Sequence, residues 1–295
     1  MKKTQKMKLL LLLLPLLVLV ACGNSSSDNT IKIGSKDFTE NLIVGEIYAL
    51  ALEDQGYNVE RVSSIASSII PQAIESSQID LYPEYTGTSL LSIFKLPLET
   101  NPDQVAQTIR EKYEEGGVLT TLDYAPANDS AGIAMKTSVA NQYKIKTLSD
   151  LQMNAENIRF ASQGEFDQRE DGIPGLEKVY GPFKFKSSKV YDNSLKYQVL
   201  KSDEADATPA YTTEGQLSDK EQFTILIDDK KFWPPYNIVP IVRQDLLKKF
   251  PNVPETLNAI NKHLTTETMI KLNASVDIDG KDYRQVAKEF YQSIK

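Results

Sequence analysis

The chain has 295 residues and a net charge of −7, with fourteen tyrosines but only one histidine and one cysteine. An acidic chain without a basic cluster argues against a nucleic-acid-binding protein, so we predict no nucleic-acid partner. One cysteine excludes an internal disulfide framework, and one histidine leaves a zinc site or a Ser-His-Asp triad without enough parts. We therefore expect no metal, no cofactor and no catalytic residue.

Residues 1–21 have the pattern of a lipoprotein signal peptide. Four lysines precede an apolar run from Leu9 to Ala21, which is too short to be a permanent membrane-spanning helix. The run ends in a lipobox, which predicts lipidation at Cys22; the alternative is an ordinary signal peptide with an incidental cysteine. Residues 22–30 are polar and rich in serine, as expected of a flexible tether. We expect a protein anchored by lipid to the outer face of the cytoplasmic membrane.

Strands and helices then alternate along the chain. Ile31–Ser35 alternates apolar and polar residues and predicts a strand, followed by a helix that Asp37 caps, with Glu40 completing a capping box. Further strands are expected at 59–62 and 79–82, with helices at 67–76 and 102–115. This alternation predicts an α/β lobe with a largely parallel sheet, in which ligands bind beyond the carboxyl ends of the strands.

A second lobe is expected to interrupt the first. Residues 125–130 join two predicted strands, 118–124 and 132–136, and we interpret them as the crossover into the second lobe. The elements expected there are strands at 159–161, 205–209 and 223–227 and helices around 174–181 and 194–201. Residues 232–242 are the predicted return crossing. Three helices at 253–264, 266–273 and 283–294 should pack on the first lobe. The predicted division is 31–127 plus 237–295 for lobe 1 and 128–236 for lobe 2.

Five motifs carry a family resemblance that extends, in order, over the whole chain after the signal peptide. They are GSKDFTEN (34–41), DLYPEYTGT (80–88), FDQREDG (166–172), TPAYTTEGQL (208–217) and FWPPYNIVPIV (232–242). The chain resembles the osmoprotectant-binding lipoproteins of bacterial ABC importers, the glycine betaine/carnitine/choline-binding proteins of the ProX and OpuC type. The resemblance implies a two-lobed periplasmic-binding-protein fold of type II with two crossovers, a ligand held between the lobes, an ABC permease as partner, and no enzymatic activity. We expect a monomer.

In that family tyrosine rings form a cage around a trimethylammonium group. The motifs place Tyr85, Tyr211 and Tyr236 at the cage positions, and Asn41, Thr88 and Asn128 at polar positions near the ligand. The chain departs from the family at Ser130, where related sequences often carry another cage tyrosine. Either Tyr124 supplies that ring or the cage is more open on this side.

The chemistry of the ligand explains these residue types. A quaternary ammonium has no N–H to donate, whereas ring faces attract its charge and its methyl groups, by about 0.5–2 kcal/mol per ring. The carboxylate of a betaine requires an arginine fork or helix N-terminal amides, for which Arg169 and the helix that begins near Pro174 are candidates. The alternative for Arg169 is that it belongs to a solvated loop. Trp233 is interpreted either as a neighbour of the cage or as a residue that packs at the hinge.

Four functions remain open. The first is delivery of glycine betaine, carnitine, choline or a related betaine to a permease. The second is the same fold with a bulkier betaine such as ergothioneine, because Ser130 leaves space. From other classes come a lipid-anchored surface hydrolase that uses only carboxylates, and a sensing or adhesion lipoprotein.

Overall fold

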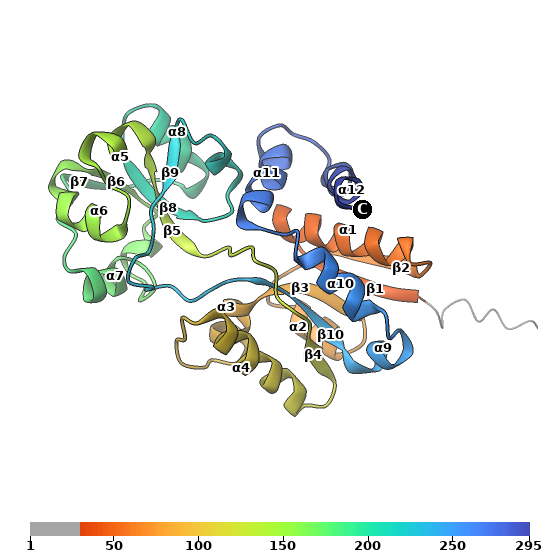
Figure 1. Cartoon of the computed structure of the whole chain (residues 1–295). Coiled ribbons are helices and arrows are strands. Elements are labelled where there is room, and N and C mark those ends of the chain that lie inside the picture. Colours follow the sequence, from red (N-terminus) through yellow and green to blue (C-terminus); the bar gives the residue numbers. More distant parts are fainter. Residues whose placement is uncertain (1–29) are drawn as a thin grey trace, which may run out of the picture.

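The computed structural model describes residues 30–295 and contains two five-stranded sheets in separate lobes (Figure 1). The signal peptide, Cys22 and nearly all of the predicted tether lie outside the described residues. In the first sheet the strand order is β2-β1-β3-β10-β4, and in the second it is β7-β6-β8-β5-β9. Helices pack around both sheets. The structure therefore confirms the two-lobed α/β fold of type II that the sequence predicts.

The first lobe combines both ends of the described chain. Its sheet contains β1 (Thr30–Lys36), β2 (Asn58–Ile65), β3 (Leu81–Tyr85), β4 (Leu119–Thr121) and β10 (Ile238–Arg243), in which β10 runs antiparallel to β3 and β4. Its helices are α1 (Thr39–Asp54), α2 (Ile70–Glu75), α3 (Thr86–Thr88), a π-helix at Ser89–Ile93, α4 (Pro102–Glu115), α9 (Gln244–Lys249), α10 (Val253–Asn261), α11 (Thr266–Asp277) and α12 (Tyr283–Ile294). Most of α1 is buried, because α10, α11 and α12 cover it.

The second lobe is formed by the middle of the chain. Its strands are β5 (Ala131–Lys136), β6 (Arg159–Ser162), β7 (Ser187–Val190), β8 (Ala207–Tyr211) and β9 (Phe223–Ile225). Its helices are α5 (Thr137–Tyr143), α6 (Leu148–Asn154), α7 (Ile173–Tyr180) and α8 (Lys196–Lys201), with 3₁₀ turns at Ala155–Asn157, Glu165–Asp167, Asn193–Leu195 and Gly215–Ser218. One hydrophobic core of this lobe includes Phe160, Leu176 and Trp233.

Two extended segments connect the lobes, one between β4 and β5 and the other between β9 and β10 (Figure 1). They run beside each other, and Asn128 forms an antiparallel bridge with Asn237. A third contact joins the lobes, because the backbone of α11 at Ala274 lies against Gly215 of the second lobe. A Cβ at Gly215 would come within 2.7 Å of this backbone, so the close approach requires glycine.

Each predicted element has a counterpart in the structure, but the sequence does not predict β7, α5, α6 and α9. The sheet of the first lobe, expected to be largely parallel, is mixed, because β10 runs antiparallel to both of its neighbours. Two further differences are informative. The predicted capping box is wrong: Phe38 occupies the N-cap of α1 and makes no side-chain cap, while Glu40 turns inward and is buried. The third strand runs from Leu81 to Tyr85 instead of ending at Tyr82, so Tyr85 is the last residue of β3. Within residues 30–295, no helix is long and apolar enough to cross a membrane.

Candidate functional site

The YTGT motif of the first lobe and the PPY motif of the return crossing meet at the end of β3. Thr86 Oγ donates a hydrogen bond to the Pro235 carbonyl at 2.9 Å and accepts one from the Asn237 amide at 3.0 Å. Between these bonds, the Tyr236 ring covers Gly87 so closely that a Cβ atom there would lie 2.8 Å from two ring carbons. The glycine of YTGT thus provides the space into which the ring of PPY packs.

The first crossover holds Tyr236 from its other side. The Asn128 side-chain oxygen accepts a hydrogen bond from the Tyr236 amide at 2.6 Å, and the Asp129 amide donates to the Tyr236 carbonyl at 3.0 Å. Both amide groups that sequence reasoning places near the ligand, those of Asn128 and Asn41, bind backbone. The Asn41 side chain accepts from the Lys36 amide at 2.7 Å and donates to the Pro83 carbonyl at 2.8 Å. These two asparagines position the motifs, and a direct ligand contact by either stays a prediction.

Tyr85 is the most enclosed of the three predicted cage rings, at 5% exposed. Its hydroxyl donates to Glu40 Oε1 at 2.9 Å, and Phe38 stacks near the ring with centroids 6.0 Å apart. Lys36 Nζ lies 5.4 Å from the ring centroid and is itself paired with the buried carboxylate of Glu84. Thr88, which ends α3 beside these residues, is half-buried.

A second group of candidate residues belongs to the second lobe, where Tyr211 ends β8 with 49% of its surface exposed. It lines a cavity of about 380 Å³ together with Arg169, Asp171 and Lys196. The Arg169 guanidinium donates through Nε to Asp171 at 2.7 Å and through a second nitrogen to the other carboxylate oxygen, a fork geometry that also suits a ligand carboxylate.

The charged residues beside Tyr211 also act on Tyr236. Burial, followed by the negative charge of Asp171, raises the pKa of Tyr236 to about 12, and Arg169 opposes that rise. Burial also raises the pKa of Tyr211, which the Arg169 charge again opposes. The two hydroxyls therefore share the field of one Arg–Asp pair, so the structure brings together Arg169, Tyr211 and Tyr236 from segments far apart in the sequence.

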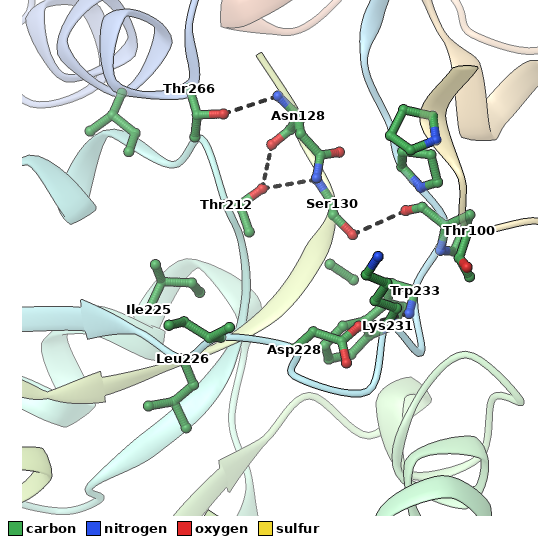
Figure 2. Close-up of a pocket in the computed structure, with 16 residues that line it drawn as sticks. Thr100, Asn128, Ser130, Thr212, Ile225, Leu226, Asp228, Lys231, Trp233 and Thr266 are labelled. Atoms are coloured by element: carbon green, nitrogen blue, oxygen red, sulfur yellow. Dashed lines mark hydrogen bonds between the residues drawn. The ribbon is translucent and has the colours of Figure 1, made fainter. Parts of the chain in front are cut away.

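Ser130 lies on a different cavity. It is 6% exposed and lines a space of about 490 Å³ with Asn128 and Trp233 (Figure 2). Its amide donates to the Thr212 hydroxyl at 2.9 Å, which in turn donates to the Asn128 carbonyl at 2.6 Å. Ala131 borders both cavities. The idea that Ser130 enlarges the cage therefore stays a prediction.

The remaining aromatic candidates have packing roles. Trp233 is 7% exposed in the core of the second lobe, and its indole N–H donates to the Asp171 carbonyl at 2.9 Å. This contact favours hinge packing and also supports the loop that carries Arg169. Tyr124 hydrogen-bonds Asp103 on α4 at 2.5 Å and packs against a core of the first lobe, so it does not replace the absent ring near Ser130.

Sequence reasoning missed a buried polar cluster behind the rings. It consists of Glu40, Thr213 and Asn273, which are at most 5% exposed, and of Asp129, which is half-buried. Burial is the main cause that raises the pKa of Glu40, and burial with the nearby Glu40 charge raises the pKa of Asp129 to about 8. The available indication was that Glu40 lies in the GSKDFTEN motif and Asp129 in the first crossover. Within residues 30–295 no group of three or more His, Cys, Asp or Glu is arranged to hold a metal.

The comparison with known proteins agrees with this geometry. Residues 29–293 match a family described as the substrate-binding domain of the ABC-type glycine betaine transport system. A glycine-betaine-binding protein of Pseudomonas aeruginosa is 32% identical over 282 residues, covering 92% of this chain and 90% of the relative. A solved structure described as a glycine betaine/carnitine/choline ABC transporter superposes with a TM-score of 0.84 at 25% identity, covering 89% of this chain and 98% of that one.

A further relative combines two functions in one chain. The ergothioneine transport permease/ergothioneine binding protein EgtU of Helicobacter pylori is 31% identical over 273 residues, which are 92% of this chain but 49% of the relative. The chain thus spans about half the length of that relative. From the family match and the shared two-lobed architecture, the protein belongs to the substrate-binding proteins of ABC importers of the glycine betaine type.

Proposed function

We propose that the protein captures a quaternary-ammonium compound between its two lobes and delivers it to an ABC permease. The observation that carries the proposal is that Tyr85, Tyr211 and Tyr236, which come from three separate motifs, all lie within the electrostatic reach of Asp129. Each ring adds about 0.5–2 kcal/mol for a trimethylammonium group. The relatives named for glycine betaine support the same ligand class.

Arg169 supplies the second half of the proposed site. A betaine carboxylate can take the place that Asp171 occupies on the guanidinium fork, exchanging one bidentate pair for another. The cationic end of the ligand would then lie against rings of both lobes, and its anionic end against the second lobe. A ligand that binds both lobes at once stabilises the closed arrangement over the open one.

The paired crossovers provide the hinge for this closure. The bridge between Asn128 and Asn237 supports a division into 31–127 plus 237–295 and 128–236, with the hinge at its boundaries. The predicted lipid on Cys22 would hold the protein at the outer face of the membrane, and the polar residues 22–30 would let it reach the permease. We propose that it works there as a monomer.

Four compounds of this class, in two groups, are candidates for the ligand. Glycine betaine, carnitine and choline are supported by most of the relatives. Ergothioneine, a bulkier betaine, is supported by the likeness to the ergothioneine-binding relative.

Isothermal titration calorimetry of the purified protein with these four compounds tests the proposal. At least one of them should bind with one-to-one stoichiometry, and the bound compound should be recovered unchanged. Absence of heat and of thermal stabilisation with all four would contradict the proposed ligand class, and turnover of a compound would contradict the role in transport.

A further inference from the structure

The polar cluster behind the rings links two carboxyl groups through one hydroxyl. Thr213 Oγ donates to Asp129 Oδ1 at 2.6 Å, and the same hydroxyl also lies within hydrogen-bonding reach of Glu40. Glu40 comes from α1 of the first lobe, Asp129 from the first crossover, and Thr213 from the segment after β8. A proton can therefore be shared between the two carboxyl groups across the boundary between the lobes.

The cluster has more acceptors than donors. Glu40 accepts hydrogen bonds from the Tyr85 hydroxyl and from Asn273 Nδ2, each at 2.9 Å, and Asn273 Nδ2 also donates to the Thr213 carbonyl at 2.9 Å. Asn273 is 5% exposed, and its side-chain oxygen is a buried atom without a hydrogen-bond partner in the described part of the chain. An excess of buried acceptors favours a bound proton or a nearby cation.

The charged groups around the cluster do not neutralise it. Glu214 adds a further negative charge next to Asp129. Glu214 is itself paired with Lys196 of α8. On β1, Lys36 is paired with Glu84. Burial raises the pKa of both carboxyl groups, and the negative charge of Glu40 raises the pKa of Asp129 further. Without a ligand, the pair retains a proton at neutral pH.

Asp129 is also close to the proposed cage. Its charge acts on the hydroxyls of Tyr85, Tyr211 and Tyr236, which are the three rings of the proposed site. Asp171 acts on only two of these hydroxyls and is already held by Arg169. Of the carboxyl groups near the rings, Asp129 is therefore the one that faces all three and lacks a basic partner among the contacts of the described residues.

We infer that the half-buried Asp129, which Thr213 and Asn273 link to Glu40, is a further ligand-binding residue that provides the counter-charge for the ligand's cation and releases the shared proton to solvent when the cation binds. The inference rests on the proposed function, because it requires a cationic ligand in the cage. A quaternary ammonium cannot donate a hydrogen bond, so it stabilises the ionised carboxyl only through charge. The bound proton must then leave, because a nearby cation favours the deprotonated form of an acid.

The release of a proton on binding determines whether ligand affinity rises or falls with pH. Binding that releases a proton becomes stronger as the pH rises, by up to about tenfold in Kd per pH unit, until the unliganded pair is itself ionised. With the pKa of Asp129 at about 8, the affinity should rise between pH 6 and 8 and level off above pH 9. Choline, glycine betaine and carnitine do not titrate in this interval, so the proton can come only from the protein.

Calorimetry with these three compounds, in buffers of low and high ionisation enthalpy (phosphate and Tris), measures the released protons. We expect nearly one proton per ligand at pH 7 and almost none at pH 9.5. All measurements use the H263Q background, because His263 is the one histidine of the chain and is exposed on α10's C-terminal side. Its removal excludes the imidazole as a source of the released proton.

Two variants assign the proton. D129N retains the acceptor for the Thr213 hydroxyl; it should release no proton, and its Kd at pH 8 should approach the Kd of the parent protein at pH 6. E40Q removes the repelling neighbour, so its proton release should move to lower pH without being lost. The matched control is E60Q, which removes one negative charge from an exposed position on β2 and should leave proton release and affinity as in the parent.

The outcomes separate this inference from the proposed function. Binding of a quaternary ammonium without proton release, with the same Kd at pH 6 and 8, overturns the role of Asp129 and leaves the proposed function intact. Unchanged proton release in D129N does the same. If none of the compounds binds at any pH, the proposed function fails, and the inference fails with it.

Discussion

The Tyr236 ring packs directly on Gly87, so that a Cβ added at Gly87 would lie 2.8 Å from two of its ring carbons. The contact joins YTGT, at the end of β3, to PPY, at the start of the return crossing. The neighbouring bond from Thr86 to Pro235 spans 149 residues of sequence. The absence of a side chain at Gly87 therefore determines the position of the Tyr236 ring, which forms one wall of the proposed cage.

Gly87→Ala should lower ligand affinity at least tenfold, because the added methyl must displace the Tyr236 ring or the Pro235 carbonyl. Overpacking of this kind destabilises by about 1–3 kcal/mol, so the fold should persist. Calorimetry and urea unfolding measure the two effects. Gly116→Ala is the matched control, because nothing lies within 4 Å of a Cβ there. Equal affinity of both variants and the parent would show that the position of Tyr236 is immaterial.

Tyr211→Ala should weaken binding of a trimethylammonium compound by about 2- to 30-fold, the equivalent of about 0.5–2 kcal/mol for one ring. Because Tyr211 is 49% exposed, the free energy of unfolding should change little. Tyr211→Phe keeps the ring face and should retain most of the affinity. A loss in Tyr211→Phe as large as in Tyr211→Ala would mean that the hydroxyl, not the ring, contacts the ligand.

Without ligand, the protein should lose stability as the pH rises from about 4 to about 8. The pKa of Asp129 is raised from 3.8 to about 8, so in this interval the folded state holds a proton that the unfolded chain has released. The free energy of unfolding therefore falls with pH, by up to about 1.4 kcal/mol per pH unit from this group. Urea unfolding at pH 5, 6, 7, 8 and 9 measures the slope. Asp129→Asn should flatten it, and the same slope in Asp129→Asn would assign the titration to other groups.

Ser130→Tyr tests the size of the ligand. A tyrosine here must project into the cavity of about 490 Å³ that Ser130 lines, so it should exclude ergothioneine and improve binding of glycine betaine. Competition between the two compounds, followed by calorimetry, measures the change. Ser130→Thr, which retains the hydroxyl and adds one methyl, is the control. If Ser130→Tyr binds both compounds as the parent does, this cavity does not determine the ligand.

The positions of most helices and strands were predictable from the sequence, because the causes of secondary structure are local. The pattern of apolar residues, Pro102 and the Gly116-Gly117 pair define α4 with the bounds that the structure has. Gly181 likewise follows α7 directly, with a positive φ of 91°. By contrast, the prediction of a capping box formed by Asp37 and Glu40 is wrong, because Glu40 instead accepts hydrogen bonds from Tyr85 and Asn273 in the tertiary structure.

The sequence by itself determined the two-lobed α/β class, the two crossovers and the motifs that carry the aromatic residues, since these depend on short-range patterns and on family likeness. Only the tertiary structure decided which groups meet. It packed Tyr236 on Gly87, placed Ser130 on a separate cavity from Arg169, and brought Asp129 near Glu40. These relationships join residues far apart in the chain, and no local pattern encodes them, because each depends on how the lobes and α11 pack together.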